Sequence, residues 1–220
     1  MNKTIVADSS SIISLAVNCM SSVLVDLSAK IMVTGGIYEE VVSRPITSKR
    51  YALESLRIRR LFSQGVISVN DPGPDATCRI LDVSNSIYRI RKHRLHLIHR
   101  GEAEALALMK QVGADVLLID ERTTRMIIED AEQLRQILSQ QINKRVEIDY
   151  GMLMEFKDIV GDIQVIRSSE VAAVAYEKGV LGSSLGAEGK EALAAMLYAL
   201  KFSGCAISWQ EIEDYLSLMK

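Results

Sequence analysis

The stretch GEAEALALMKQVGADVLLIDE, residues 101–121, decides the fold class because it joins a helix to a buried strand. Apolar residues on most faces and strong helix formers predict a helix over 102–112. Gly113 then stands where the end of a helix requires a residue that tolerates positive φ. The continuous apolar run at 116–119 is typical of a strand that is buried on both faces.

The lengths of these two elements place two acids together. The helix covers about 15 Å at ~1.5 Å per residue, and the returning segment covers roughly 20 Å at ~3.3 Å per residue. Glu102, at the start of the helix, and Asp120, at the end of the strand, are therefore expected at the same edge of a sheet. This edge is the carboxyl end of the strand, where open α/β sheets bind their ligands.

Strands and helices alternate along the rest of the chain, which predicts a mostly parallel sheet covered by helices on both faces. The fold class is therefore α/β, a three-layer α/β/α sandwich with a helical C-terminal elaboration. We expect a core over 1–125 and a mainly helical extension over 126–220 that packs on it. The predicted strands lie at 4–7, 31–33, 66–69 and 163–166, and further helices at 37–42, 49–64, 126–142 and 188–202.

Composition narrows the class of protein. The chain has 220 residues, is 48% apolar and 25% charged, and carries a formal charge of −2, so no overall basic field indicates nucleic-acid binding. The 3 cysteines form no Cys-x-x-Cys pair, which argues for a reducing compartment and against a zinc ribbon. No stretch resembles a signal peptide or a membrane span, so we expect a cytoplasmic protein.

Four acids fall at strand ends or in the first turns of helices: Asp8, Glu40, Glu102 and Asp120. Carboxylates crowded at one edge need a positive charge to stay ionised. Mg²⁺ and Mn²⁺ are the natural neutralisers, because hard cations take oxygen ligands and can activate water against a phosphodiester. Taken singly, each acid is more simply a helix cap or a solvated charge, and their joint placement favours the functional interpretation.

These segments resemble the PIN domain family of nucleases. The resemblance lies in IVADSSSIISLA, IYEEVV, RGEAEALALMKQVGADVLLIDERTTR and, more weakly, AMLYALKFSGCAI. It implies an α/β/α sandwich and a metal-dependent ribonuclease, in many members the toxin of a toxin–antitoxin pair. By motif, Asp8, Glu40, Glu102 and Asp120 are the catalytic acids. Of these, Asp8, Glu102 and Asp120 would hold Mg²⁺ or Mn²⁺, and Ser10 is the small polar residue that supports the first acid.

The sequence departs from the family pattern at one residue, and it leaves open which glutamates are the catalytic acids. Leu118 replaces the threonine usual two places before the last acid, which weakens the assignment of the groups that orient the ligands. Glu39 or Glu104 could replace Glu40 or Glu102, and Glu121 may assist. Glu104 lies about 200° from Glu102 around a helix, so both cannot easily be ligands.

The segment RIRKHRLHLIHR, residues 89–100, is strongly basic and precedes the third acid. It is either a phosphate-binding stripe, which would include Arg94 and Arg100, or a solvated basic face. Its three histidines lack a nearby carboxylate or cysteine, so a metal site there is improbable. Arg122 and Arg125, just after Asp120, are better placed to bind substrate phosphates. Aromatic residues make up only 5% of the chain, so little base stacking is expected.

Three functions compete. The leading one is a Mg²⁺- or Mn²⁺-dependent endoribonuclease that uses activated water. A phosphatase with an aspartyl nucleophile would need an acid where Ser10 stands, and is disfavoured. The third is a catalytically silent PIN-like module for RNA binding or assembly. Expected partners are RNA, an antitoxin-like protein and further copies of the chain, with no membrane. The candidate face for self-association is made by Leu193, Met196, Leu197 and Leu200.

Overall fold

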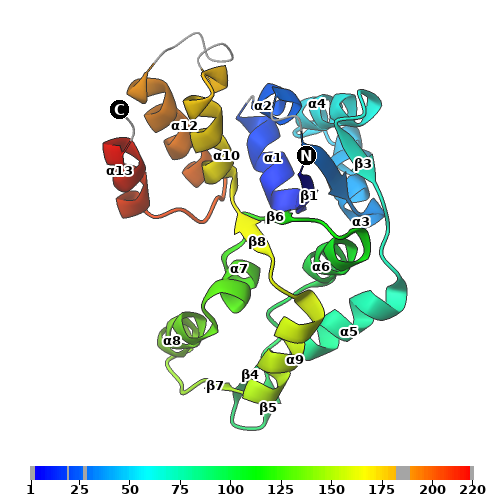
Figure 1. The fold of residues 1–220 in the computed structure, drawn as a ribbon, viewed down its shortest axis with the longest axis vertical. Helices are drawn as coiled ribbons and strands as arrows, with labels where there is room; N and C mark the ends of the chain where they lie inside the picture. Colours follow the sequence, from blue (N-terminus) through cyan, green and yellow to red (C-terminus); the bar gives the residue numbers. More distant parts are fainter. Residues whose placement is uncertain (1–2, 19, 27–28, 182–188, 219–220) are drawn as a thin grey trace.

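The computed structural model describes residues 3–18, 20–26, 29–181 and 189–218 of the 220-residue chain. Helices and strands follow one another along most of it (Figure 1). Their bounds are β1 (Thr4–Ala7), α1 (Ser9–Val17), α2 (Ser21–Asp26), β2 (Lys30–Val33), α3 (Gly35–Tyr38), η1 (Glu39–Ser43), η2 (Pro45–Thr47), α4 (Ala52–Ser63), β3 (Ile67–Val69), α5 (Pro74–Ser84), β4 (Tyr88–Ile90), β5 (His93–Arg94), α6 (Arg100–Val112), β6 (Val116–Leu118), α7 (Arg122–Glu129), α8 (Ala131–Ile142), β7 (Glu147–Ile148), α9 (Tyr150–Val160), β8 (Gln164–Ile166), α10 (Ser168–Glu177), α12 (Lys190–Phe202) and α13 (Trp209–Leu218).

The main sheet of the described chain has 5 strands in the order β3-β2-β1-β6-β8, and each neighbouring pair is parallel. The chain adds β2 and β3 on one side of β1 and then returns to add β6 and β8 on the other side. The direction of building thus reverses between β1 and β6, where Ala7 pairs with Leu118. Open α/β sheets bind ligands beyond the carboxyl ends of the strands at such a reversal.

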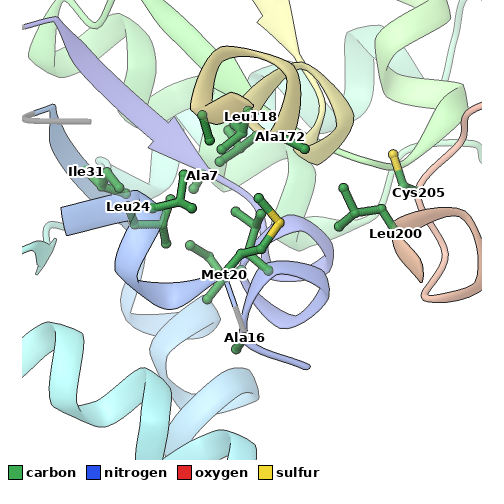
Figure 2. Close-up of a cluster of buried hydrophobic side chains, with 14 of the residues drawn as sticks. Ala7, Ala16, Met20, Leu24, Ile31, Leu118, Ala172, Leu200 and Cys205 are labelled. Atoms are coloured by element: carbon green, nitrogen blue, oxygen red, sulfur yellow. The ribbon is translucent and has the colours of Figure 1, made fainter. Parts of the chain in front are cut away.

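The strands are buried on both faces because their side chains alternate between two hydrophobic clusters. Ile5 and Ala7 of β1 belong to one cluster, which holds residues of α1, α2, α4, α10 and α12 (Figure 2). Val6 belongs to the other cluster, which holds residues of α5, α6, α7, α8 and α9. The predicted α/β class, with helices on both faces of a parallel sheet and further helices toward the C-terminus, is confirmed.

Several local predictions hold because the sequence carries its own start and stop signals. α1 begins at Ser9 because the Asp8 carboxylate accepts a hydrogen bond from the Ser10 N–H. α6 ends at Val112 because Gly113 has φ 60°, and its N–H donates to the Met109 carbonyl. The quoted stretch therefore folds as expected, into α6 followed by β6.

The predicted helix over 126–142 is wrong in one respect, since the structure has two helices, α7 and α8. Asp130 separates them, with φ −148°, and its carboxylate accepts a hydrogen bond of 2.9 Å from the Gln133 N–H. This side chain caps α8 in place of a backbone carbonyl. Similarly, the helix expected over 37–42 is divided into α3 and a π-helical turn, η1.

The basic segment forms a small antiparallel sheet of the order β5-β4-β7, apart from the main sheet. Arg89 of β4 pairs with Asp149, and Arg94 of β5 pairs with Asp82. Arg91 connects the two strands in the left-handed region, with φ 56°. Residues 91–94 are exposed, which is compatible with both interpretations of this segment.

The proposed association face of α12 is wrong, because its residues belong to the core of the chain itself. The helix packs on α10 and α13 (Figure 1). Its apolar stripe, which fits an interface as well as a core by periodicity alone, is at most 4% exposed. The buried residues are Leu193, Met196, Leu197 and Leu200.

Among the described residues, we find no helix of sufficient length and apolar character to cross a membrane.

Candidate active site at the carboxyl edge of the sheet

Polar residues follow the carboxyl ends of the strands on both sides of the reversal in strand order. Asp8 follows β1, and its N–H donates a 2.9 Å hydrogen bond to the Leu118 carbonyl of β6. Asp120 lies two residues beyond β6, and Ser168 lies two residues beyond β8. The pairing of three adjacent parallel strands therefore brings these side chains to one edge, as the sequence predicted for the two aspartates.

Ser10 holds the first acid in place. Its hydroxyl donates a 2.7 Å hydrogen bond to Asp8 Oδ2, and its N–H donates a second bond of 3.1 Å to the same oxygen. Asp8 is 7% exposed, so these two bonds replace water on one carboxylate oxygen while Oδ1 is left without a partner in the described chain. Ser10 therefore orients a buried carboxylate.

Asp120 is held in the same way by a residue that the sequence analysis did not single out. Ser168 donates its N–H to Asp120 Oδ1 and its hydroxyl to Oδ2, each over 2.7 Å. Asp120 is 1% exposed and Ser168 is fully buried. A signal for Ser168 does exist, since Ser168 and Ser169 follow β8 much as Ser9 to Ser11 follow β1.

The alternation of side chains along β6 separates the two neighbouring acids. Leu118 and Ile119 belong to opposite hydrophobic clusters, so Asp120 points to the side of α10 and Glu121 to the side of α6. The hydrogen bonds of Asp120 to Ser168 agree with this direction. The third carboxylate on the side of Asp8 and Glu102 is thus Glu121, one of the alternatives left open by the sequence.

Electrostatics link these three acids. Burial raises the pKa of the Glu102 carboxyl above its ordinary value, and the negative charges of Asp8 and Glu121 raise it further. A backbone hydrogen bond and the nearby His99 act in the opposite direction. Glu102 Oε2 also accepts a 3.1 Å hydrogen bond from the His99 N–H at the start of α6. Glu102 therefore lies within electrostatic reach of both other carboxylates.

Glu121 also caps the helix that follows it. Its Oε1 accepts from the Thr123 N–H and its Oε2 from the Thr124 N–H, each over 2.7 Å. These bonds fix the carboxylate at the N-terminus of α7, where the helix dipole favours negative charge.

Glu104 has different hydrogen-bond partners from Glu102. Its Oε1 accepts a 2.7 Å bond from Arg100 Nε, and its Oε2 accepts a 3.4 Å bond from the Thr34 hydroxyl at the end of β2. A Cβ on Gly36 would lie only 2.9 Å from this Oε2, so a larger residue there would displace the Glu104 carboxylate. Arg100, predicted to bind substrate, thus forms an ion pair with Glu104.

Glu40 lies in the π-helical turn η1 and is exposed. It forms no hydrogen bond or ion pair with the described residues, whereas its neighbour Glu39 pairs with Arg44 over 3.6 Å. The charges that act on Glu102 do not include Glu40. The structure therefore links Glu102 with Asp8 and Glu121, and it leaves Glu40 without such a link.

A pocket of about 510 Å³ is lined by two of the predicted substrate-binding arginines, Arg122 and Arg125. Ala206 also lines it, and its N–H donates a 3.2 Å hydrogen bond to the backbone carbonyl of Asp120. The pocket therefore adjoins the strand end that carries Asp120. Arg94 does not line it, since this residue lies on the small sheet with Asp82.

The donor atoms at this edge are of the kind that a hard divalent cation takes. Carboxylates are the ligands that Mg²⁺ and Mn²⁺ prefer, and Mg²⁺ usually keeps several waters and uses only one or two carboxylates. Burial is the main cause of the raised pKa of Glu102, and the smaller part that comes from the charges of Asp8 and Glu121 is a repulsion that a bound cation would relieve. Among the residues that the structure describes, no three His, Cys, Asp or Glu side chains are grouped closely enough to hold a metal.

Cys205 lies near Asp120 but lacks the features of a nucleophile. Burial, followed by the Asp120 charge, raises the pKa of its thiol to about 11. The thiolate is the reactive form of cysteine, so this side chain is protonated and inert at neutral pH. The acids, and not the cysteine, are the chemically useful groups at this edge.

Comparison with known proteins agrees with this geometry. A search of curated proteins finds no match. A family model described as PIN domain matches residues 4–135, which run from β1 into α8 and include Asp8, Glu102, Asp120 and Glu121. The chain therefore belongs to the PIN domain family.

Proposed function

We propose that the protein is a metal-dependent endoribonuclease that hydrolyses RNA phosphodiester bonds with water. The observation that carries this proposal is the position of Asp8 and Asp120 beyond two adjacent parallel strands, at the reversal of strand order. PIN domains are commonly nucleases, and the resemblance noted from the sequence implies the same chemistry. The coupling of Glu102 to Asp8 and Glu121 supports a cation-binding role for this edge.

Each group has a proposed task. Asp8 and Glu102 would hold Mg²⁺ or Mn²⁺, with Glu121 as the third carboxylate on their side of the sheet. Asp120 is the third metal ligand by motif and stays a candidate, although its side chain points to the side of α10, where Ser168 holds it. Such an ion supplies activation of water and stabilisation of negative charge on the phosphate. A carboxylate has about four lone-pair sites, so Asp120 can bind a cation while it accepts from Ser168.

The residues around the acids keep them oriented and bind the substrate. Ser10 and Ser168 hold the two aspartates through hydroxyl hydrogen bonds of 2.7 Å. Arg122 and Arg125 line the adjoining pocket and would bind RNA phosphates. Glu40 is retained as a proposed catalytic acid, and Arg94 and Arg100 as proposed contacts to RNA outside the pocket.

The test is cleavage of an RNA that contains single-stranded and structured regions, in Mg²⁺, Mn²⁺ or EDTA. We expect cutting that requires the metal and falls by about 100-fold or more in Asp8→Asn and Glu102→Gln. Parallel assays of Asp120→Asn and Glu121→Gln decide which of these two acids contributes more. Asp75→Asn, which removes an exposed acid of α5, is the matched control and should cleave normally.

Two outcomes would contradict the proposal. Cutting that is unchanged in Asp8→Asn would exclude this edge as the active site. Binding of RNA without cutting under all metal conditions would favour the silent RNA-binding or assembly module. An antitoxin-like partner, self-association and a cytoplasmic location remain predictions, which co-purification, sedimentation and fractionation would test.

A further inference from the structure

Three aromatic side chains gather on the surface of the C-terminal helices, in a chain that is only 5% aromatic. They are Tyr198 and Phe202 of α12 and Trp209 of α13, with exposed fractions of 39%, 78% and 53%. The ring centroid of Trp209 lies 5.9 Å from that of Tyr198 and 5.8 Å from that of Phe202. We call this group the aromatic patch.

The aromatic patch is continuous with the pocket beside Asp120. Lys201 lines the pocket, and its Nζ lies 4.7 Å from the centroid of the Trp209 ring. Ser208 also lines the pocket and directly precedes Trp209. The aromatic patch and the pocket therefore adjoin each other through Lys201 and Ser208.

Two cations that line this pocket lack an ion-pair partner among the described residues. Each of its carboxylates already has a partner: Glu129 pairs with Arg125, Glu211 pairs with Arg167, and Asp130 caps α8. In contrast, Arg122 and Lys201 form no ion pair with the described residues; Arg122 Nε contacts Met126 Sδ, and Lys201 Nζ donates to the Ile207 carbonyl. Neither of these two positive charges is neutralised by a carboxylate of the described chain, so both can attract a phosphate.

We propose that the pocket and the aromatic patch together bind single-stranded RNA, with phosphates between Arg122 and Lys201 and bases on Trp209 and Phe202. This inference rests on the proposed function, which it extends by naming residues of the C-terminal helices, beyond the segment that matches the family, that bind the RNA. A cationic groove beside exposed aromatic rings is the arrangement with which proteins bind single strands. A duplex keeps its bases stacked on one another and cannot place them on these rings.

The binding surface combines two parts of the chain. Arg122 belongs to the segment that matches the PIN domain, whereas Lys201, Phe202 and Trp209 lie beyond residue 135. The C-terminal helices thus acquire a role in substrate selection. Aromatic residues are few in the composition, 1 Trp, 7 Tyr and 3 Phe, but three of them lie together in the aromatic patch and can stack with bases there.

Trp209 offers a direct readout because it is the only tryptophan in the chain. The experiment titrates the full-length protein, in EDTA, with an eight-nucleotide oligouridylate and follows Trp209 fluorescence. We expect a saturable change for the single strand and a much smaller one for an RNA duplex of matched length. The absence of divalent metal prevents cleavage, so binding is measured apart from the proposed nuclease activity.

Two variants retain the tryptophan. Phe202→Ala, at a side chain that is 78% exposed, should weaken binding of the oligonucleotide by about tenfold, the order expected for one lost stacking contact. Lys201→Gln should also flatten the dependence of log affinity on log salt by about 0.7. Arg50 and Tyr51, which directly precede α4, provide the matched controls, because the Arg50 guanidinium lies 5.1 Å from the centroid of the Tyr51 ring. Arg50→Gln and Tyr51→Ala should leave the affinity for the oligonucleotide unchanged.

The outcomes separate this inference from the proposed function. Saturable binding that depends on Phe202, in a protein that cuts no RNA, would uphold the inference and reject the nuclease. Normal affinity in Phe202→Ala, with cutting that still depends on Asp8, would overturn the inference and leave the nuclease intact. If Phe202→Ala instead converts a dimer to a monomer in sedimentation and leaves RNA affinity unchanged, the patch binds a second copy and the inference is wrong.

Discussion

Ser168→Ala is the sharpest test of how the acidic edge is built. The Ser168 hydroxyl donates a 2.7 Å hydrogen bond to Asp120 Oδ2, and the two residues are 0% and 1% exposed. Alanine removes this donor and leaves the carboxylate oxygen in a place that water reaches poorly. The backbone N–H of residue 168 would still donate to Oδ1, so half of the hydrogen bonding to Asp120 is retained.

The expected cost follows from the loss of one hydrogen bond to a charged group, about 1.5–3 kcal/mol. For a protein of 150–250 residues, about 2–4 °C of melting temperature corresponds to each kcal/mol. We therefore expect Ser168→Ala to lower the midpoint of thermal unfolding by about 3–12 °C, measured by circular dichroism. Urea unfolding should show a lower midpoint with an unchanged slope.

Ser14→Ala is the matched control. Ser14 of α1 is 1% exposed, and its hydroxyl has no hydrogen-bond partner among the described residues. Replacement of an unsatisfied buried hydroxyl by alanine is nearly neutral or stabilising. If Ser168→Ala and Ser14→Ala change the midpoint equally, or Ser168→Ala by less than about 1 °C, the argument that Ser168 sustains the Asp120 carboxylate fails.

Two further predictions concern ionisable groups. Arg167 is buried and pairs with Glu170 over 2.6 Å and with Glu211 over 2.9 Å. Arg167→Met should therefore lower the free energy of unfolding, measured in urea at pH 7, by about 2–4 kcal/mol. This loss is smaller than for a fully buried pair because both carboxylates keep some contact with solvent. Burial opposes ionisation of Glu170 and Glu211, yet Arg167 helps to hold the pKa of each carboxyl below its ordinary value. The stability that the two ion pairs contribute is therefore present above about pH 4.3 and is lost as the pH falls through the lowered pKa values. A stability difference between wild type and Arg167→Met that is the same at pH 3 as at pH 7 would contradict this reasoning. Glu102→Gln should raise the midpoint of thermal unfolding of the metal-free protein at pH 7. The raised pKa of Glu102 means that ionisation of this carboxyl at neutral pH destabilises the folded state. A lower unfolding midpoint in the variant would refute this prediction.

The sequence predicted the part of the site that depends on local signals. Glu102, Gly113 and Asp120 belong to one continuous helix–strand unit, whose periodicity and cap residues can be read from the sequence. The break at Asp130 was missed although a signal existed, since an aspartate three residues before a glutamine is a helix-start pattern. Local patterns thus carried most of the secondary structure.

Contacts between distant segments could not be predicted in the same way. Ser168 meets Asp120 only because β8 pairs with β6, and the sequence does not state which strands are neighbours. The exposed aromatic patch likewise forms only when α13 packs on α12. The apolar stripe of α12 around Leu197 was predicted to be an association face but lies in the core. Helical periodicity could not distinguish these two environments, because it fits both equally.

The order of the strands in the sheet has a consequence for how the protein is made. The ribosome releases the chain from its N-terminus, and domains begin to fold as they emerge. Asp8 and Asp120 thus leave the ribosome before Ser168, which supplies the hydrogen bonds that fix Asp120, and before Ala206, which binds the Asp120 backbone. A nascent chain therefore carries both acids for part of its synthesis without the partners that position Asp120. For the nuclease proposed above, this order would leave the acidic edge incomplete until Ser168 and Ala206 have emerged.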